Sequence, residues 1–275
     1  MIKNYARPTT VKIPETLKSI VLNTFTGGSE GPMTVTYPMY ATGFPLLLHA
    51  AYGLPKISVN SKESMVEERL NLAGQIYNAD IFLSYENSVV EATGLVFHPM
   101  APYYLFGINA KAIINHWVPL NKIYGKLHPA IEEITNITNV ENRVSLMLEF
   151  IEDVYKERKE PLVWLERAIT DIINANGNIE IQEIIEKVKV SDRHFRRVFK
   201  EIVGMPPKHF CKVLQINTIF QMMEQKNEGL LNLALECGYF DQSHFISDFK
   251  KYIGETPTNF LKSNHSFIKS YLAIR

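Results

Sequence analysis

The sequence has few cysteines and no long apolar run, and each of these absences excludes a class of protein. Its 275 residues include two cysteines, Cys211 and Cys237, which form neither a C-x-x-C pair nor a metal-ligand spacing with nearby histidines. We interpret both as reduced, buried residues. No stretch approaches the ~18 apolar residues of a membrane span, and the N-terminus lacks the apolar segment of a signal peptide. We therefore expect a cytoplasmic protein without a membrane partner.

The sequence also lacks net charge, with 29 Lys and Arg against 29 Asp and Glu. Residues 1–160 hold 14 basic and 16 acidic side chains, and residues 161–275 hold 15 and 13, so the two parts carry −2 and +2. Such a small positive excess does not by itself indicate a nucleic-acid-binding domain. The positions of the charges must therefore decide which partner the protein binds.

Signatures of catalysis and of cofactor binding are scarce. There is no P-loop and no dinucleotide-binding fingerprint. The N-terminal part contains several histidines but no H-x-H pair followed by a carboxylate at the spacing of a cupin-like metal site, so we interpret them as structural: His49, His98, His116 and His128. Both cysteines lie in the C-terminal part, which argues against a methyl-accepting repair enzyme. We expect no enzyme activity, no metal and no cofactor.

The apolar pattern changes along the chain and predicts an α+β protein of two domains. Short runs rich in Val, Ile, Tyr, Phe and Thr are typical of strands at Ser19–Phe25, Met33–Tyr40, Ile81–Tyr85 and Gly94–His98. From His128 onward the apolar residues recur every three or four positions, as in helices, until a charged run ends at Pro161. We predict a β-rich domain ending in helices over residues 1–160 and an all-α domain over residues 161–275.

The C-terminal part contains an internal repeat with an offset of 50 residues. His194-Phe195 matches His244-Phe245, and Phe199-Lys200 matches Phe249-Lys250. Three further matches follow at the same offset: Gly204 with Gly254, Pro207 with Pro257, and Phe210 with Phe260. Matches of rare residue types at one offset indicate a duplicated unit, which we interpret as a helix, a turn, a second helix and a glycine stop.

In the first unit, Ser191 is a good N-cap for a helix that runs to about Val203 before Gly204 closes it. An apolar stripe is predicted to be buried: Phe195, Val198, Phe199 and Ile202. Four cations share the outward face: Arg193, Arg196, Arg197 and Lys200. Mutual repulsion of these charges would be relieved by DNA, whose major groove accepts a helix. A solvated face without a partner is the alternative, but the supporting helix Ile181–Val188 favours a helix-turn-helix unit.

In the second unit, Leu231–Cys237 is the predicted supporting helix, Gly238 supplies the turn, and Asp241 or Gln242 starts the reading helix. Its outward positions suit hydrogen bonds to base edges and, at Ile246, an apolar contact with a thymine methyl group: Gln242, Ser243, Ile246, Ser247 and Lys250. Asp248 adds a negative charge, so we expect this unit to contribute less affinity. Between the units, Lys208–Met223 is predicted to form a helical spacer of about 24 Å.

These motifs resemble the AraC/XylS family of bacterial transcription regulators over residues 162–262. In the first unit the resemblance rests on the block Ser191–Lys200, followed by Gly204 and Pro207. In the second unit it rests on three shorter blocks followed by Gly254 and Pro257: Ala234–Tyr239, Asp241–Phe245 and Phe249–Lys251. It implies duplex DNA and RNA polymerase as partners and an activator as the activity. It also implies base-reading positions at Arg193, Arg196, Arg197, Gln242, Ser243, His244, Ile246 and Ser247.

Several positions depart from the family pattern. Ile185 stands in place of a small alanine, and Lys189 stands in place of the turn glycine, so a non-glycine residue is expected in a strained turn. Gln215 and Ser247 replace arginines that are usual in the family.

More loosely, residues 1–155 resemble the sensor domain of some members, through Gly94–Gly107 and Trp117–Leu120. We therefore hypothesise an N-terminal domain that senses a small effector, whose binding residues the sequence does not indicate. The alternative hypothesis is a protein-interaction or homodimerisation domain without a small ligand. An enzymatic N-terminal domain is the least favoured interpretation.

Overall fold

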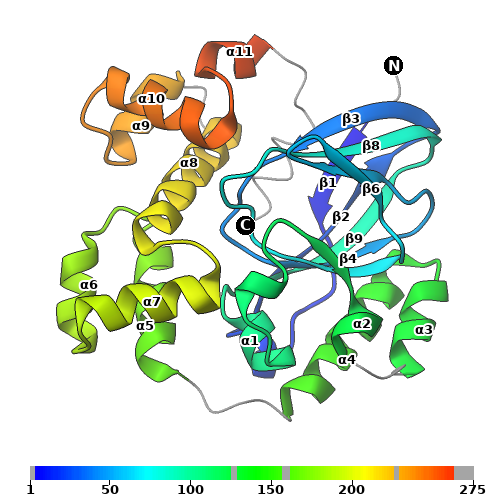
Figure 1. The fold of residues 1–275 in the computed structure, drawn as a ribbon. Helices are drawn as coiled ribbons and strands as arrows, with labels where there is room; N and C mark the ends of the chain where they lie inside the picture. The colour runs from blue at the N-terminus through cyan, green and yellow to red at the C-terminus, as the bar shows by residue number, and fades with distance from the viewer. Residues whose placement is uncertain (1–3, 125–128, 157–161, 226–228, 263–275) are drawn as a thin grey trace.

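The computed structural model describes residues 4–124, 129–156, 162–225 and 229–262. They form a β-rich N-terminal domain and a helical C-terminal domain that pack side by side (Figure 1). The predicted α+β architecture is confirmed, while the predicted domain boundary at Pro161 lies outside the described residues. Within the described ranges, no helix combines the length and the apolar character that a membrane crossing requires.

The N-terminal domain contains two antiparallel sheets. The six-stranded sheet has the order β1 (Asn4–Pro8), β2 (Val21–Ser29), β9 (Glu91–Phe97), β4 (Leu46–Ala50), β7 (Leu70–Ala73) and β10 (Trp117–Pro119). The four-stranded sheet has the order β3 (Met33–Met39), β8 (Ile81–Ser88), β5 (Lys56–Val59) and β6 (Lys62–Met65). Phe25 and Leu48 of one sheet and Leu83 and Tyr85 of the other line one cavity of about 40 Å³. The two sheets therefore face each other across an apolar core.

Helix α4 (Val140–Lys156) packs on strand β9 of the six-stranded sheet, and three shorter elements pack against α4: η1 (Glu15–Leu17), α1 (Ala101–Phe106) and α3 (Pro129–Asn136). Helix α2 (Leu120–Tyr124) contacts β7 and β10, and η2 (Ala110–Ala112) contacts the C-terminal domain. Arg143 anchors α4 to strand β9. Its side chain is 1% exposed, and its guanidinium donates to the Glu91 carboxylate at 3.0 Å and to the Thr93 hydroxyl at 2.9 Å. Two backbone carbonyls, those of Ile137 and Thr138, accept its remaining donors. A buried charge is tolerated here because every side of it is paired.

The C-terminal domain is all helix in the described residues: α5 (Val163–Asn174), α6 (Ile181–Val188), α7 (Asp192–Val203), α8 (Pro207–Gln225), α9 (Leu230–Glu236), α10 (Gln242–Ile253) and α11 (Pro257–Lys262). Helix α8 links two helix groups, with α5–α7 at one end and α9–α11 at the other (Figure 1). At 19 residues it is longer than the predicted spacer and spans about 28 Å.

Helix α8 also packs against the N-terminal domain, so the two domains share their cores. The loop before β4 makes the contact: the Asn217 side-chain amide donates to the Thr42 carbonyl at 2.6 Å. Gly43, with φ +84°, follows it, and a Cβ added there would lie 3.1 Å from both Phe210 and Leu214. We call this contact between residues 41–44 and α8 the seam. The absence of a side chain at Gly43 lets the loop backbone approach the helix closely.

The predicted strands are confirmed as β2, β3, β8 and β9 with shifted ends, and the predicted helical region after His128 is confirmed as α3 and α4. Both cysteines are free and buried, as expected.

Candidate nucleic-acid interface

The first helix-turn-helix unit consists of α6 and α7. The Ser191 side chain caps α7 by accepting from the His194 backbone N–H at 3.3 Å, and Gly204 ends the helix with φ +95°. The predicted stripe Phe195, Val198, Phe199 and Ile202 is buried, which confirms the orientation of α7. Lys189, in the turn, has φ +55°. The expected strained turn is therefore present, because an L side chain in the left-handed region is unfavourable.

The four predicted cations of α7 are exposed, but two of them already have acidic partners. Arg196 donates to both carboxylate oxygens of Asp192 at 2.9 Å, and Arg197 donates to Glu201 at 2.9 Å. The hydrogen bond from Arg196 lowers the pKa of Asp192, and Asp192 in turn raises the pKa of Arg196. The predicted repulsion among four unpaired cations is thus an overestimate, because the sequence also places an acid four residues from two of them.

The remaining cations, Arg193 and Lys200, form no ion pair with the described residues. Both ion pairs on α7 are solvent-exposed, with the Arg197 side chain 56% exposed. Exposed pairs of this kind are weak and exchange easily with other anions. Helix α7 can therefore still present four basic groups to a phosphate backbone.

The second unit consists of α9 and α10. Asp241 caps α10 by accepting from the His244 backbone N–H at 2.8 Å, and Gly254 ends it with φ +88°. The predicted outward residues Gln242, Ser243, His244, Ser247 and Lys250 are exposed. Ile246 is half-buried and packs against the apolar core, so its side chain is less available than the sequence suggests.

Asp248 does not face outward as a free charge. Its carboxylate lies 3.1 Å from the Lys212 ammonium of α8 and 3.4 Å from Nε2 of His244, and the Asp248 and Lys212 side chains are each 17% exposed. The Lys212 ammonium also lies 4.3 Å from the centre of the Tyr239 ring. These contacts attach the second reading helix to α8. Lys212 therefore balances the charge of Asp248, and the weaker DNA affinity expected of this unit stays a prediction.

Residues of both reading helices open onto one groove of about 800 Å³. Arg196 of α7 and His244 of α10 line it, together with Lys208 and Lys212 of α8 and with Gly238 of the turn between α9 and α10. Two glutamates, Glu180 and Glu183, border the same groove. Since the two reading helices share a groove, they present residues toward the same side of the C-terminal domain.

The C-terminal end of α7 packs against the N-terminal domain, and that of α10 faces the same domain across a cleft. Gly204, at the end of α7, is so close to η2 that an added Cβ would lie 3.1 Å from the Cβ of Ala110. Gly254, at the end of α10, lines a cleft with Tyr40 and Ile81 of the N-terminal domain. The N-terminal ends of both helices therefore point away from that domain. Helix-turn-helix proteins present these ends to base edges in the major groove.

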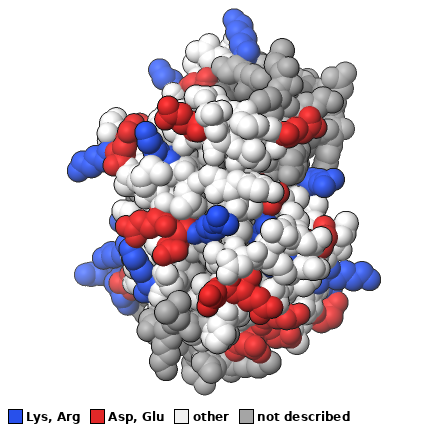
Figure 2. Space-filling model, turned by 90° about the vertical axis from the view of Figure 1, so that its right-hand side faces the viewer, with Lys and Arg blue, Asp and Glu red and all other residues white. Residues whose placement is uncertain are grey.

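The opposite side of the molecule has a different charge pattern. Figure 2 shows the face of the N-terminal domain that is turned away from α7 and α10, and its basic and acidic side chains are interspersed. Among the residues drawn in colour there, we see no large continuous basic area. The part of this face drawn in colour therefore offers no basic area that competes with the helical side as the candidate interface.

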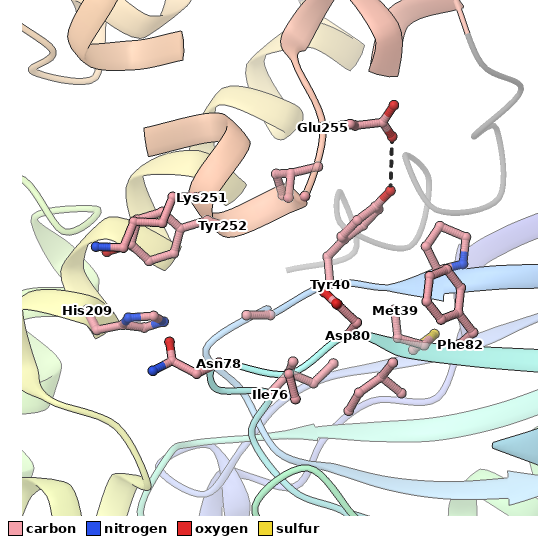
Figure 3. Close-up of a pocket in the computed structure, with 16 residues that line it drawn as sticks. Met39, Tyr40, Ile76, Asn78, Asp80, Phe82, His209, Lys251, Tyr252 and Glu255 are labelled. Carbon is pink, nitrogen blue, oxygen red and sulfur yellow. Dashed lines mark hydrogen bonds between the residues drawn. The ribbon is translucent and has the colours of Figure 1, made fainter. Parts of the chain in front are cut away.

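A second cleft, of about 620 Å³, lies at the junction of the two domains. In the view of Figure 3, Lys251, His209 and Asn78 lie at one end of the cleft, and Met39 and Phe82 lie at the other. Above them, the Tyr40 hydroxyl donates to the Glu255 carboxylate at 3.5 Å, a contact between the residue that follows β3 and the segment that follows α10. We call this space the junction cleft. It combines polar groups with an apolar wall, as ligand sites do.

His209 connects the junction cleft to both domains. Its ring lies 4.6 Å from the Tyr77 ring of the N-terminal domain and 4.7 Å from the Tyr252 ring of α10, measured between centroids. Burial, and then the charge of Lys251, lowers the pKa of His209 to about 4. His209 is therefore neutral at pH 7 and acts as an aromatic contact rather than as a cation.

Two features bear on catalysis in the described part of the chain. No set of three His, Cys, Asp or Glu side chains there is arranged to hold a metal ion. Gly27 to Gly31 has the G-x-S-x-G spacing of a nucleophile elbow, but Ser29 lies at the end of β2. Its hydroxyl donates to the Gly31 carbonyl and accepts from the Val90 N–H, so it stabilises a strand end.

Sequence reasoning missed three features of this interface. Lys208 and Lys212 reach the groove from α8, although the sequence assigned α8 only a spacer role. The third feature is the junction cleft, which assembles residues more than 100 positions apart. For the lysines the i, i+4 spacing along α8 was an available signal, whereas nothing local in the sequence indicates the cleft.

Comparison with known proteins finds similarity to one family over part of the chain. Residues 184–263 match the family described as a helix-turn-helix domain. The HTH-type transcriptional regulator ArgR of Pseudomonas aeruginosa is 30% identical over 84 residues, which are 30% of this chain and 26% of that protein. The chain thus spans about a quarter of the length of this curated relative.

Two further similarities extend beyond the helix-turn-helix region. The lactose operon transcription activator of Staphylococcus xylosus is 23% identical over 216 residues, which are 68% of this chain and 77% of that protein. The crystal structure of an apo ToxT variant from Vibrio cholerae aligns with a TM-score of 0.52 and 11% identity, covering 87% of this chain and 97% of that one. ToxT with a bound unsaturated fatty acid aligns with a TM-score of 0.50 and 10% identity, over 86% and 94% of the two chains. The ToxT similarity establishes a shared fold across both domains.

Proposed function

We propose that this protein is a sequence-specific DNA-binding transcription regulator of the AraC type, since residues 184–263 match the family described as a helix-turn-helix domain. The observation that carries the proposal is the arrangement of α7 and α10. The C-terminal ends of both helices face the N-terminal domain, both helices point their capped N-terminal ends away from it, and residues of both line one groove. A duplex offers two successive major grooves about 34 Å apart, and α8, about 28 Å long, separates the two units by a comparable distance.

We assign the two reading helices different parts in DNA recognition. On α7, Arg193, Arg196 and Arg197 are proposed to read base edges, since an Arg fork pairs with guanine O6 and N7, and Lys200 to contact phosphate. On α10, the side chains of Gln242, Ser243, His244 and Ser247 suit base contacts, and Lys250 suits a phosphate. To contact DNA, Arg196 must break its ion pair with Asp192, and Arg197 must break its ion pair with Glu201. Asp192 is exposed and Glu201 is partly exposed, so solvent reaches both ion pairs and this exchange is feasible.

The salt dependence of binding tests the proposal. An operator is first identified by selection from random duplexes, and its affinity is then measured by mobility shift in rising salt. With ~6 phosphate contacts, the logarithm of the affinity should fall with the logarithm of salt concentration with a slope of about −5. Lys200→Ala should reduce this slope by about 1, whereas Lys62→Ala, on the exposed strand β6, should leave it unchanged. A slope near zero for the unaltered protein would refute DNA binding.

Base reading is tested separately with arginine variants. Arg196→Ala and Arg197→Ala should each weaken operator binding by about 1–3 kcal/mol and relax the preference at one base pair, if each arginine is bidentate to guanine. Asp192→Asn should keep or increase affinity, because it releases Arg196. Unchanged base preference in both arginine variants would remove the assignment.

We further propose that the N-terminal domain senses a small molecule that binds in the junction cleft. What supports this is the composition of its walls: β3 and the segment around Asn78 come from the N-terminal domain, and Lys251 to Glu255 come from the end of the second reading helix. A ligand there contacts both domains and favours one position of α10 over another. Activation of transcription through contact with RNA polymerase, in the cytoplasm, completes the proposed function.

A thermal-shift screen tests effector sensing. The probes are lactose, because a relative of this chain is a lactose operon activator, and oleic acid, because ToxT binds an unsaturated fatty acid. A ligand at 100 times its dissociation constant stabilises the protein by about 2.7 kcal/mol. The stabilisation should disappear in Ala41→Phe, which fills the cleft. Concentration-dependent dimerisation without any ligand effect would instead support the alternative, an N-terminal dimerisation domain.

A further inference from the structure

The turn between α9 and α10 exposes a large apolar side chain. Phe240 is 90% exposed, more than any other large hydrophobic residue in the described part of the chain; Val163 follows at 66% and Tyr52 at 56%. Its neighbour Tyr239 is 3% exposed and packs against Phe245. The buried Tyr239 fixes the backbone of the turn, so that Phe240 projects into solvent from a well-anchored position.

Phe240 lies beside the N-terminal end of α10, the end that is proposed to point into the major groove. It directly precedes Asp241, the N-cap of α10, and Gln242, the first residue of the helix. Gly238 of the same turn lines the groove that Arg196 and His244 share. In the first unit the residue before the N-cap is Val190, which is half-buried and packs against the core. The two units therefore differ at this position, and only the second presents an aromatic ring.

The chemistry of this position selects one kind of contact. A phenyl ring has no hydrogen-bond donor or acceptor and no charge, so it cannot pair with phosphate or with the polar edges of bases. The apolar group that B-DNA offers in the major groove is the C5-methyl of thymine, which protein side chains such as Phe contact. Ile246, to which the sequence assigned a thymine contact, is half-buried in the core. Phe240 is thus better placed for that role.

We infer that Phe240 is a specificity-determining residue of the second helix-turn-helix unit, which recognises a thymine by packing its ring on the C5-methyl group. The inference rests on the proposed DNA-binding function. It adds an apolar base contact outside α10 itself and predicts a thymine requirement near one end of the second half-site.

Removal of a single methyl group from the operator tests the inference. Each thymine of the second half-site is replaced in turn by deoxyuridine, which keeps the hydrogen bonds of the base and lacks the methyl. For the unaltered protein, one such replacement should weaken binding about 4-fold, the ratio that corresponds to ~0.8 kcal/mol for one buried CH₂ group. Phe240→Ala should bind the thymine operator more weakly than the unaltered protein does. The variant should bind the thymine and deoxyuridine operators with the same affinity. Phe240→Leu, which keeps an apolar side chain, should retain the sensitivity.

Two control variants and one physical measurement complete the design. Tyr52→Ala removes an exposed aromatic ring from the N-terminal domain, and Leu235→Ala removes an exposed apolar side chain from α9. Both should preserve the full methyl dependence. Circular dichroism of Phe240→Ala should match the unaltered protein, since the ring contributes nothing to the core.

Several outcomes overturn the inference. If Phe240→Ala still loses affinity on methyl removal, then the ring does not contact that methyl. If the variant binds all duplexes as the unaltered protein does but sediments as a smaller species, then Phe240 packs against a second copy of the chain. Failure of the unaltered protein to bind any selected duplex would refute the proposed function itself, which keeps the two failures distinct.

Discussion

Three glycines allow a quantitative test of how firmly the two domains hold the reading helices. Gly43, Gly204 and Gly254 all have positive φ, at +84°, +95° and +88°. A Cβ at Gly43 would lie 3.1 Å from Phe210 and Leu214 across the seam, and one at Gly204 would lie 3.1 Å from Ala110. A Cβ at Gly254 would have nothing within 4 Å. Alanine at Gly254 therefore imposes only the backbone penalty, and alanine at the other two adds a contact between domains.

The expected losses follow from these contacts. Alanine in the left-handed region costs about 1 kcal/mol, so Gly254→Ala should lower the free energy of unfolding by roughly that amount. At 3.1 Å the neighbours must move by a few tenths of an ångström, and overpacking at the lower end of its usual range adds about 1 kcal/mol. Gly43→Ala and Gly204→Ala should therefore each lose about 2 kcal/mol.

Urea unfolding measures the three free energies, and operators with altered half-site spacing report the positions of the reading helices. Gly43→Ala should lower the preference for the natural spacing, because it pushes α8 away from the N-terminal domain, while Gly254→Ala should keep it. If all three variants lost the same free energy and kept the same spacing preference, the described packing between the domains would not exist in solution, and the reasoning would be wrong.

Three further predictions concern individual side chains. Burial lowers the pKa values of His49 and His98 to about 4, so below pH 6.5 the unfolded chain binds more protons than the folded protein. The free energy of unfolding should therefore fall by about 2 kcal/mol for each histidine between pH 7 and pH 5. In urea titrations, His98→Asn should reduce this fall. Lys189→Gly should raise the free energy of unfolding, measured by calorimetry, by roughly 0.5–1 kcal/mol, because glycine adopts the positive φ at this position without strain. Asp248→Ala should lower the free energy of unfolding by about 1–3 kcal/mol, because it leaves the Lys212 ammonium without its partner. The double variant Asp248→Ala with Lys212→Met should recover most of this loss in a double-mutant cycle of denaturation, since no charge is then left unpaired.

The helix-turn-helix units could be predicted closely because their signals are local. Ser191 and Asp241 cap the helices they precede, and Gly204 and Gly254 end them. Caps and glycine stops act within one helical turn, so the sequence alone places them. The sequence also contained the pairing of Arg196 with Asp192 four residues earlier, although the prediction treated the cations as unpaired.

The N-terminal domain was harder to predict because several of its strands are buried on both faces. Strands β4 and β7 are buried at every position, so they lack the alternation that identifies a strand. Among the strands that were predicted, β3 and β8 alternate between more and less exposed residues, whereas β2 and β9 are largely buried and were predicted from their β-branched and aromatic residues.

The sequence by itself determined which segments of the C-terminal part form helices, where those helices begin and end, and which of their faces are apolar, because each of these depends on residues within a few positions of one another. The tertiary structure alone decided that Lys212 pairs with Asp248 and that Ile246 is half-buried while Phe240 is exposed. It also decided that the C-terminal ends of both reading helices face the N-terminal domain. These features depend on contacts between residues distant in the chain, which only the packing of helices and sheets brings together.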